Sequence, residues 1–119
     1  KYDLLVQEAK KILVPAAHEL DVAVILASPL HGGLLGSKRD HWRDSGRYGD
    51  AFEKQERVDS VLEKHGLESV DTGLRYLLSD ERVSIILSGV DSVAEVDRSV
   101  AVSDGRFLSA ALIEEIEAA

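Results

Sequence analysis

Two kinds of hydrophobic pattern alternate along the chain. Apolar residues recur at the three- and four-residue spacing of amphipathic helices in five segments, at about 5–20, 51–65, 69–78 and 93–100 and from 109 onward. Two other segments, 22–27 and 83–87, are short apolar runs rich in β-branched residues, which is typical of strands buried on both faces of a parallel sheet. The predicted order is helix, strand, long loop, two helices, strand and two helices, with parallel pairing through right-handed crossovers.

Four helix boundaries can be predicted from single residues. Pro15 lies inside the first helical segment, where it should kink the helix or mark the first turn of a second helical piece. Gly66 is placed to end the second helix. Ser69 is a candidate N-cap of the third, and Ser92 with Glu95 three residues later forms a capping box that starts the fourth.

A long loop is predicted from Ser28 to Asp50, because this stretch contains Pro29, several glycines and many charges. Loops of this length inside a compact domain usually carry function or lack order. The loop also carries four basic residues, Lys38, Arg39, Arg43 and Arg47. They could bind a small anionic ligand, although a solvated loop explains the same charges.

Two parallel strands do not make a self-sufficient sheet, because each leaves an apolar edge with unpaired backbone groups. A complete (β/α)₈ barrel takes roughly 250 residues, and the 119 residues here would supply part of one. We therefore expect residues 1–119 to form a single partial α/β domain that belongs to a longer protein or pairs with another chain. The alternative is a small two-layer α/β domain with a further strand that the pattern does not reveal.

The composition is that of an ordinary globular protein, with 45% hydrophobic and 30% charged residues. No apolar run reaches the ~18 residues that a membrane span requires, so no membrane partner is expected. A net charge of −8 argues against binding to the phosphate backbone of nucleic acids. The chain has no cysteine, which excludes disulfides and thiolate metal sites and fits a reducing compartment; the expected location is the cytoplasm.

Four segments resemble the C-terminal part of the aldo-keto reductase barrel. Residues 22–35, VAVILASPLHGGLL, resemble its seventh strand with the following loop, and residues 83–100, VSIILSGVDSVAEVDRSV, resemble its eighth strand with the glycine turn and helix behind it. Residues 72–78, TGLRYLL, are similar to the helix before that last strand, and 2–5, YDLL, to the segment leaving the sixth strand. The loop is most similar to the branch of sugar and aldose dehydrogenases.

This resemblance implies an oxidoreductase on a (β/α)₈ TIM barrel that moves hydride between NAD(P)(H) and a carbonyl or alcohol substrate, such as a small carbonyl compound or a polyol. The family's catalytic tyrosine, lysine, aspartate and histidine lie on the first half of the barrel, and no residue of this chain matches them. The chain is therefore expected to hold the cofactor and no catalytic residue, and to need the missing N-terminal part of the barrel or another chain. The alternative is a non-catalytic fragment or interaction module whose open sheet edges pair with a partner.

The resemblance also assigns cofactor-binding residues to the two strand ends. The loop over the pyrophosphate matches Ser28, Pro29, Leu30 and Gly33, with Lys38 and Arg47 near basic positions of the family, and the adenosine end matches Gly89, Asp91, Glu95, Arg98 and Ser99. Gly89 lets the backbone approach a ligand, and the helix after Ser92 begins with N–H groups that favour an anion.

Asp91 and Glu95 depart from the family pattern, which has serine at the first position and often arginine or glutamine at the second. Two carboxylates should repel a 2′-phosphate and accept a hydrogen bond from a free 2′-hydroxyl, so NAD is the favoured cofactor over NADP. A simpler interpretation is that Asp91 is a turn residue and Glu95 belongs to the capping box. This interpretation is compatible with a preference for NAD. Ala27 replaces a position that is often aromatic in the family.

Two histidines of the loop have functional and structural interpretations. His31 follows the seventh-strand motif and could line the substrate pocket, although a solvent-facing loop histidine is the simpler reading. His41 with Asp40 and Asp44 matches no established metal spacing, so no metal is expected. Trp42 is interpreted as an anchor that packs the loop, or as a lid over the cofactor.

Overall fold

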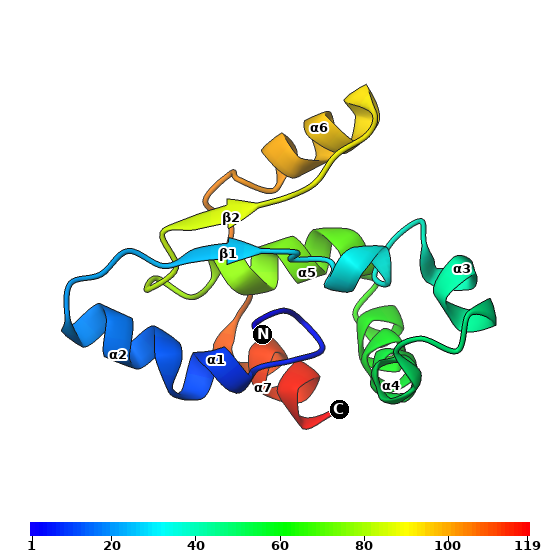
Figure 1. Cartoon of the computed structure of the whole chain (residues 1–119), viewed down its shortest axis with the longest axis horizontal. Coiled ribbons are helices and arrows are strands. Elements are labelled where there is room, and N and C mark those ends of the chain that lie inside the picture. Colours follow the sequence, from blue (N-terminus) through cyan, green and yellow to red (C-terminus); the bar gives the residue numbers. More distant parts are fainter.

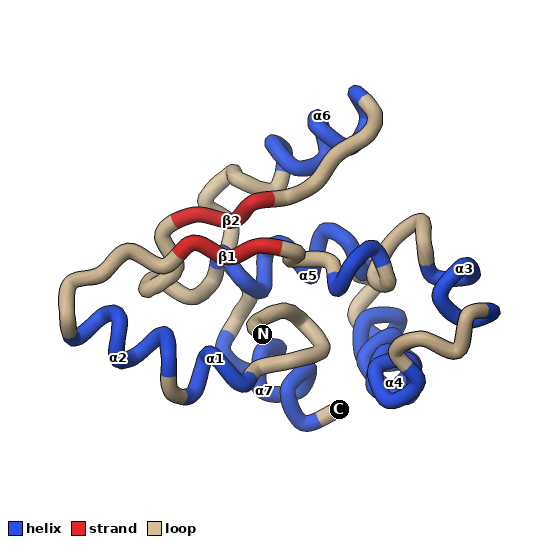
Figure 2. Tube along the Cα trace, viewed as in Figure 1, coloured by secondary structure: helices blue, strands red, loops and turns tan.

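The computed structural model describes residues 1–119. Two short strands, β1 (Ile25–Ala27) and β2 (Ile85–Leu87), lie side by side (Figures 1 and 2). They pair in parallel, with Leu26 opposite Ile86. A 3₁₀ turn, η1 (His31–Gly33), follows β1. The helices are α1 (Glu8–Lys11), α2 (Leu13–Glu19), α3 (Arg39–Asp44), α4 (Gly49–Lys64), α5 (Ser69–Leu78), α6 (Val93–Ala101) and α7 (Ala110–Ala118). The predicted α/β class and the parallel pairing are confirmed.

The first helical segment is divided into α1 and α2 at Ile12, whose backbone φ of −126° is not helical. Pro15 lies in the first turn of α2, where its missing N–H removes no intrahelical bond. Of the two outcomes predicted for Pro15, a kink in one helix or the first turn of a second helix, the second is correct. None of the helices has both the length and the apolar character needed to cross a bilayer.

The hydrophobic core lies in the helical layer on one side of the strands. Its members come from the N-terminal segment, the segment leading into β1, the residues after η1 and helices α2, α4, α5 and α7; they are Tyr2, Leu4, Leu5, Val14, Val24, Leu34, Leu35, Val58, Leu62, Tyr76, Leu77 and Ile116. The large apolar residues of α4, α5 and α7 belong to this core or pack against it, except for the partly buried Val70 and Leu78 and for Leu74, which is buried outside it. Burial of these side chains is what holds the helices together, because helices of this length are marginal alone.

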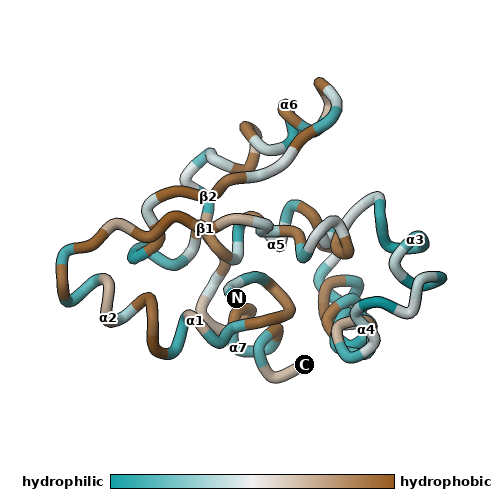
Figure 3. Tube along the Cα trace, viewed as in Figure 1, coloured by the Kyte–Doolittle hydropathy of each residue, from teal (hydrophilic) through white to brown (hydrophobic).

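The other face of the strands is open, which corrects the expectation of strands buried on both faces. Ile25, Ile85 and Leu87 are each more than half exposed, whereas Leu26 and Ile86 point toward the helices and are partly buried. Figure 3 shows both strands as hydrophobic along their length. The pattern is that of a doubly covered strand, but this chain covers only one face.

Helices α2 and α6 also carry uncovered apolar residues. Ile12, Leu13 and Leu20 were expected on an inward face and are exposed, as is the α6 row Val93, Val96 and Val100. Figure 1 shows α6 beyond the β2 edge of the sheet, whereas α1, α2 and α7 lie beyond β1. Periodicity identified these helices correctly, but no segment of this chain covers these six side chains, although Val14 on the other side of α2 is buried in the core.

Two local predictions were wrong. The stretch 28–50 is not one loop, since it contains η1 and the two-turn helix α3, which has no buried residue and therefore no apolar stripe to reveal it. Ser69 is the first residue of α5, with Glu68 at the N-cap position, and no side chain caps this helix. The Ser69 hydroxyl instead donates to Oδ1 of Asp59 on α4 at 2.9 Å. Gly66, at φ +65°, directly follows the C-cap residue of α4 and ends this helix as predicted.

Candidate functional site

The carboxyl ends of β1 and β2 lie at the same edge of the sheet, because the strands are parallel and in register. Ser28 follows β1 directly and Ser88 follows β2 directly. Ligands bind at this edge in both barrel and open α/β folds. The two turns that leave the strands are therefore the natural starting point for a site.

A pocket of about 730 Å³ opens at this edge. Four segments line it: the loop after β1, the start of α5, the turn after β2, and α6. Its residues are Ser28, Pro29, Leu30, Gly32, Gly33, Leu35, Gly36, Ser37, Lys38, Arg39, Glu68, Ser69, Val70, Ser88, Gly89, Val90, Asp91, Glu95, Arg98 and Ser99. The volume is within the range of small-molecule and cofactor sites.

The structure brings together all but one of the eleven predicted cofactor residues, the exception being Arg47. Its guanidinium lies 5.1 Å from the ring centroids of both Trp42 and Tyr48, outside the pocket lining. Sequence reasoning missed the segment Glu68–Val70, because α5 precedes β2 in the chain and only its packing brings its amino end to the pocket. Trp42 anchors the loop, as its Nε1 donates to the Gly32 carbonyl at 3.0 Å.

The polar groups of the pocket suit an anionic ligand that also carries hydroxyl groups. The lining contains three cations, three carboxylates and five serine hydroxyls; these are Lys38, Arg39 and Arg98, then Glu68, Asp91 and Glu95, then Ser28, Ser37, Ser69, Ser88 and Ser99. The guanidinium and ammonium groups bind phosphate oxygens, and carboxylates accept hydrogen bonds from ribose hydroxyls. This donor set fits a dinucleotide.

The turn after β1 brings a cation close to the backbone. Gly33 has φ +89°, a conformation that side chains other than glycine rarely adopt. A Cβ built on Gly33 would lie 3.1 Å from the Cβ and Cδ of Lys38, and the Lys38 N–H donates to the Gly33 carbonyl at 3.2 Å. The absence of a side chain at Gly33 therefore makes room for Lys38 beside the turn.

Arg39 is held by helix α4. Its Nη2 pairs with Oδ2 of Asp59, whose Oδ1 accepts the Ser69 hydroxyl, while the buried Nε of Arg39 has no partner. A single carboxylate thus connects two pocket residues from different segments. Arg39 is one of the four basic residues noted in the loop sequence, and it lines the pocket.

The start of α6 forms the opposite wall. Ser92 caps the helix by accepting the Glu95 N–H at 3.3 Å, and the Glu95 carboxylate accepts the Asp91 N–H at 2.9 Å. The reciprocal bond thus goes to the residue before the N-cap. Farther along, Nε of Arg98 lies 3.2 Å from Asp71 Oδ1, an ion pair without hydrogen-bond alignment.

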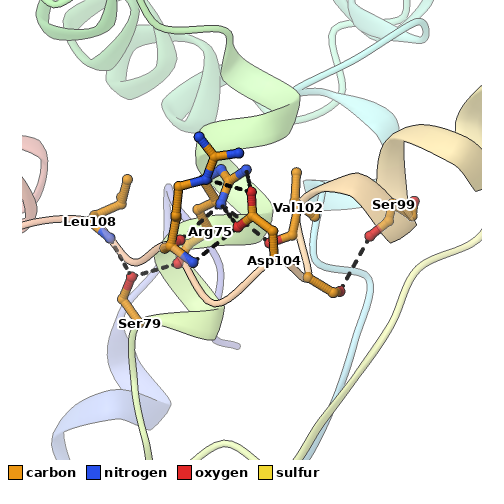
Figure 4. Close-up of polar contacts among 8 residues, drawn as sticks. Arg75, Ser79, Ser99, Val102, Asp104 and Leu108 are labelled. Atoms are coloured by element: carbon orange, nitrogen blue, oxygen red, sulfur yellow. Dashed lines mark hydrogen bonds and ion pairs between the residues drawn. The ribbon is translucent and has the colours of Figure 1, made fainter.

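The position of α6 depends on the segment between α6 and α7. Arg75 on α5 donates to both carboxylate oxygens of Asp104, at 2.7 and 3.1 Å, and to the carbonyls of Val102 and Arg106 (Figure 4). The hydrogen bonds from Arg75 hold the pKa of Asp104 well below its usual range, and those to Asp104 raise the pKa of Arg75. This fork anchors the end of α6 to α5 and so fixes one wall of the pocket.

His31 belongs to the loop after β1, but its side chain does not line the pocket. It is 3% exposed, so the expectation of a solvent-facing histidine is wrong. Its Nδ1 lies 2.9 Å from Oδ2 of Asp3, which is 2% exposed and also accepts the N–H groups of Leu5 and Val6 at 2.9 Å. A contact of His31 with substrate stays a prediction.

A second hollow of about 480 Å³ lies on the amino-terminal side of β2, away from the pocket. Burial and a hydrogen bond to Asp80 raise the pKa of Tyr2, whose hydroxyl donates to Asp80 at 2.9 Å. Burial opposes ionisation of Asp80, but hydrogen bonds from Arg82 and Tyr2 outweigh it and hold the pKa of Asp80 below its usual value. These groups satisfy one another, which indicates a structural role.

Parallel βα units with a polar pocket at the carboxyl ends of their strands define an α/β protein of the ligand-binding kind. The model of the aldo/keto reductase family matches residues 1–119, and the chain belongs to this family. A curated relative, "Uncharacterized oxidoreductase YrpG" of Bacillus subtilis (strain 168), is 27% identical over 103 residues, covering 81% of this chain and 32% of the relative. The chain thus spans about a third of that relative's length.

Two solved structures share the fold. The holo form of aldo-keto reductase AKR11C1 from Bacillus halodurans superposes with a TM-score of 0.73 at 20% identity, covering 99% of this chain and 40% of that one. The thermostable aldo-keto reductase Tm1743, in complex with the inhibitor epalrestat, gives a TM-score of 0.68 at 17% identity, covering 99% and 37%. At these identities the likeness establishes the fold alone.

Proposed function

We propose that this chain forms the cofactor-binding C-terminal portion of an aldo/keto reductase barrel. The whole protein would be an oxidoreductase that moves hydride between NAD(P)(H) and a carbonyl or alcohol substrate. The strongest support is the pocket at the strand ends, which gathers the predicted cofactor residues other than Arg47 from segments far apart in the sequence. The chain's part in the reaction is to bind and orient, because no residue in it matches the family's catalytic groups.

Each wall of the pocket would hold a different part of the dinucleotide. Lys38 supplies positive charge for the pyrophosphate, and Gly33 and Gly89 leave the backbone open to close approach. When bound, the nicotinamide supplies the hydride donor or acceptor. Titration of the chain with NADH, followed by fluorescence, tests this assignment, and Lys38→Gln should weaken binding about tenfold, as expected for the loss of one charge-assisted hydrogen bond.

Asp91 and Glu95 support a preference for NAD(H). Both carboxylates line the pocket, while Arg98, a cation of the same wall, is paired with Asp71. A 2′-phosphate would meet two negative charges there, so NADPH should bind at least tenfold more weakly than NADH. Asp91→Asn should narrow this difference, and a wild-type preference for NADPH by tenfold would disprove the assignment.

The remainder of the barrel is the proposed partner. Ile25, Ile85 and Leu87 on the open sheet face, and the valines of α6, are apolar surfaces that this chain leaves uncovered. A separately produced N-terminal portion should associate with the chain and restore dinucleotide-dependent activity. Ile85→Asp should abolish association without disturbing the core, and Glu56→Asp on the exposed face of α4 serves as a control.

The same uncovered faces favour the second candidate, an interaction module that pairs its open edges with an unrelated partner. Failure of the N-terminal portion to bind, together with the absence of NADH binding, would favour this candidate. For the first candidate we propose a cytoplasmic location and a small carbonyl or polyol substrate. Assays with a panel of aldoses and simple aldehydes, with NAD⁺ or NADH, test the substrate class.

A further inference from the structure

The loop after β1 that lines the pocket, residues 28–38 (the pocket loop), has an unusual backbone for its sequence. Ser28 and His31 adopt φ values of 59° and 52°, in the left-handed region that residues other than glycine rarely occupy. Gly32 and Gly33, which follow His31 directly, have φ of 67° and 89°. Backbone in such conformations persists only where its surroundings impose it, so something must hold this loop in place.

A buried contact between His31 and Asp3 restrains the loop from the side away from the pocket. Both side chains are nearly inaccessible, and Nδ1 of His31 lies 2.9 Å from Oδ2 of Asp3. The other oxygen of Asp3 accepts two backbone N–H groups, from Leu5 and Val6. Asp3 is thus fixed in the N-terminal segment, and because its carboxylate accepts hydrogen bonds, Nδ1 of His31 is the donor.

The His31 ring is also packed from the side. It meets Tyr48 edge-on at 5.1 Å between ring centroids, and Tyr48 in turn meets Trp42 at 5.6 Å. A Cβ built on Gly32 would lie 3.1 Å from the Tyr48 hydroxyl. The ring therefore cannot leave its place without moving the aromatic cluster behind the loop.

We infer that the Asp3–His31 pair is a clamp that holds the pocket loop in its ligand-binding conformation. His31 does not line the pocket, but Leu30, Gly32 and Gly33 beside it do. His31 and Asp3 are accordingly positioning residues, which act through the backbone on either side of His31. The inference rests on the proposed function only in taking a dinucleotide as the ligand of this loop.

The test combines loop-resolved amide hydrogen exchange with NADH binding, in the full-length protein. His31→Leu removes the donor and disfavours the positive φ, so amides of residues 30–38 should exchange at least tenfold faster while those of α5 stay within twofold. The NADH dissociation constant should rise at least fivefold. His31→Asn should stay near the wild type, because asparagine tolerates positive φ and its amide can donate to Asp3.

Two further variants keep the outcome decisive. Asp3→Asn leaves an oxygen for Leu5 and Val6 but removes the carboxylate, and should accelerate exchange of the loop alone even if His31→Leu does not fold. His65→Asn removes a surface pair, in which Nε2 of His65 lies 2.8 Å from Glu115, and should change nothing. The clamp is refuted if a folded His31→Leu leaves loop exchange unchanged, if His31→Asn resembles His31→Leu, or if Asp3→Asn leaves loop exchange unchanged or accelerates the loop and α5 together. If the wild type fails to bind NADH, the proposed function fails, whereas loop exchange still decides the clamp.

Discussion

Gly33 offers the most direct test of how the backbone shapes the pocket. In Gly33→Ala an alanine has to adopt φ +89°, and its new methyl group would lie 3.1 Å from the aliphatic chain of Lys38. The backbone conformation costs about 1–2 kcal/mol of unfolding free energy. The contact is tighter than ordinary van der Waals packing, so Lys38 has to shift by a few tenths of an ångström.

Gly46→Ala is a matched control, since Gly46 has φ +66° and nothing lies within 4 Å of a Cβ built on it. Both variants should lose about 1–2 kcal/mol of stability in urea unfolding. Only Gly33→Ala should also weaken NADH binding, by roughly tenfold, which corresponds to about 1.4 kcal/mol. Equal dinucleotide affinities of the two variants would refute the argument that Gly33 serves to place Lys38.

Three further results are expected. Leu77→Ala, at a fully buried core position, should destabilise the protein by about 2–5 kcal/mol, whereas Ile12→Ala, at a position that is 78% exposed, should change stability by less than about 0.5 kcal/mol; urea unfolding measures both. Burial opposes ionisation of Glu117, but hydrogen bonds from Lys10 and Tyr76 outweigh it and lower the pKa of Glu117 below 4.5. The stability that ionised Glu117 contributes is therefore present above pH 4.5 and is lost as the pH falls through the lower folded-state pKa. A pH series of thermal melts would detect this loss. Arg75→Gln should release the segment 102–108 and increase its cleavage by a non-specific protease, with the exposed Arg57→Gln as the control.

The elements that could be predicted from the sequence are those with a strong apolar pattern. The helices around Leu62 and Leu77 and the two strands were recognised because burial of one helical face or of a continuous run leaves a periodic signal. Helix α3 left no such signal, since it buries no residue. The exposure of Val93 on α6 could not be foreseen either, because periodicity reports that a face is apolar and not which segment covers it.

The pocket was predictable only as far as motifs reach. The residues after each strand could be assigned from the resemblance and from the rule that parallel strands end at one edge. The participation of Glu68 and the link from Arg39 through Asp59 to Ser69 required the packing of α4 and α5, which no local pattern encodes. The pairing of His31 with Asp3 joins residues 28 positions apart and replaced the expected solvent-facing side chain with a buried one.

The separation between the two strands has a consequence for the order of folding. Ser84, just before β2, bonds to Val24, just before β1, across 60 residues of chain, whereas the helices form from contacts within a few residues. Closing so long a loop is entropically costly before the strand contacts compensate for it. The sheet should therefore consolidate after the individual helices have formed, and since the pocket exists only where the strand ends meet, a refolding chain should regain ligand affinity only once the strands have paired.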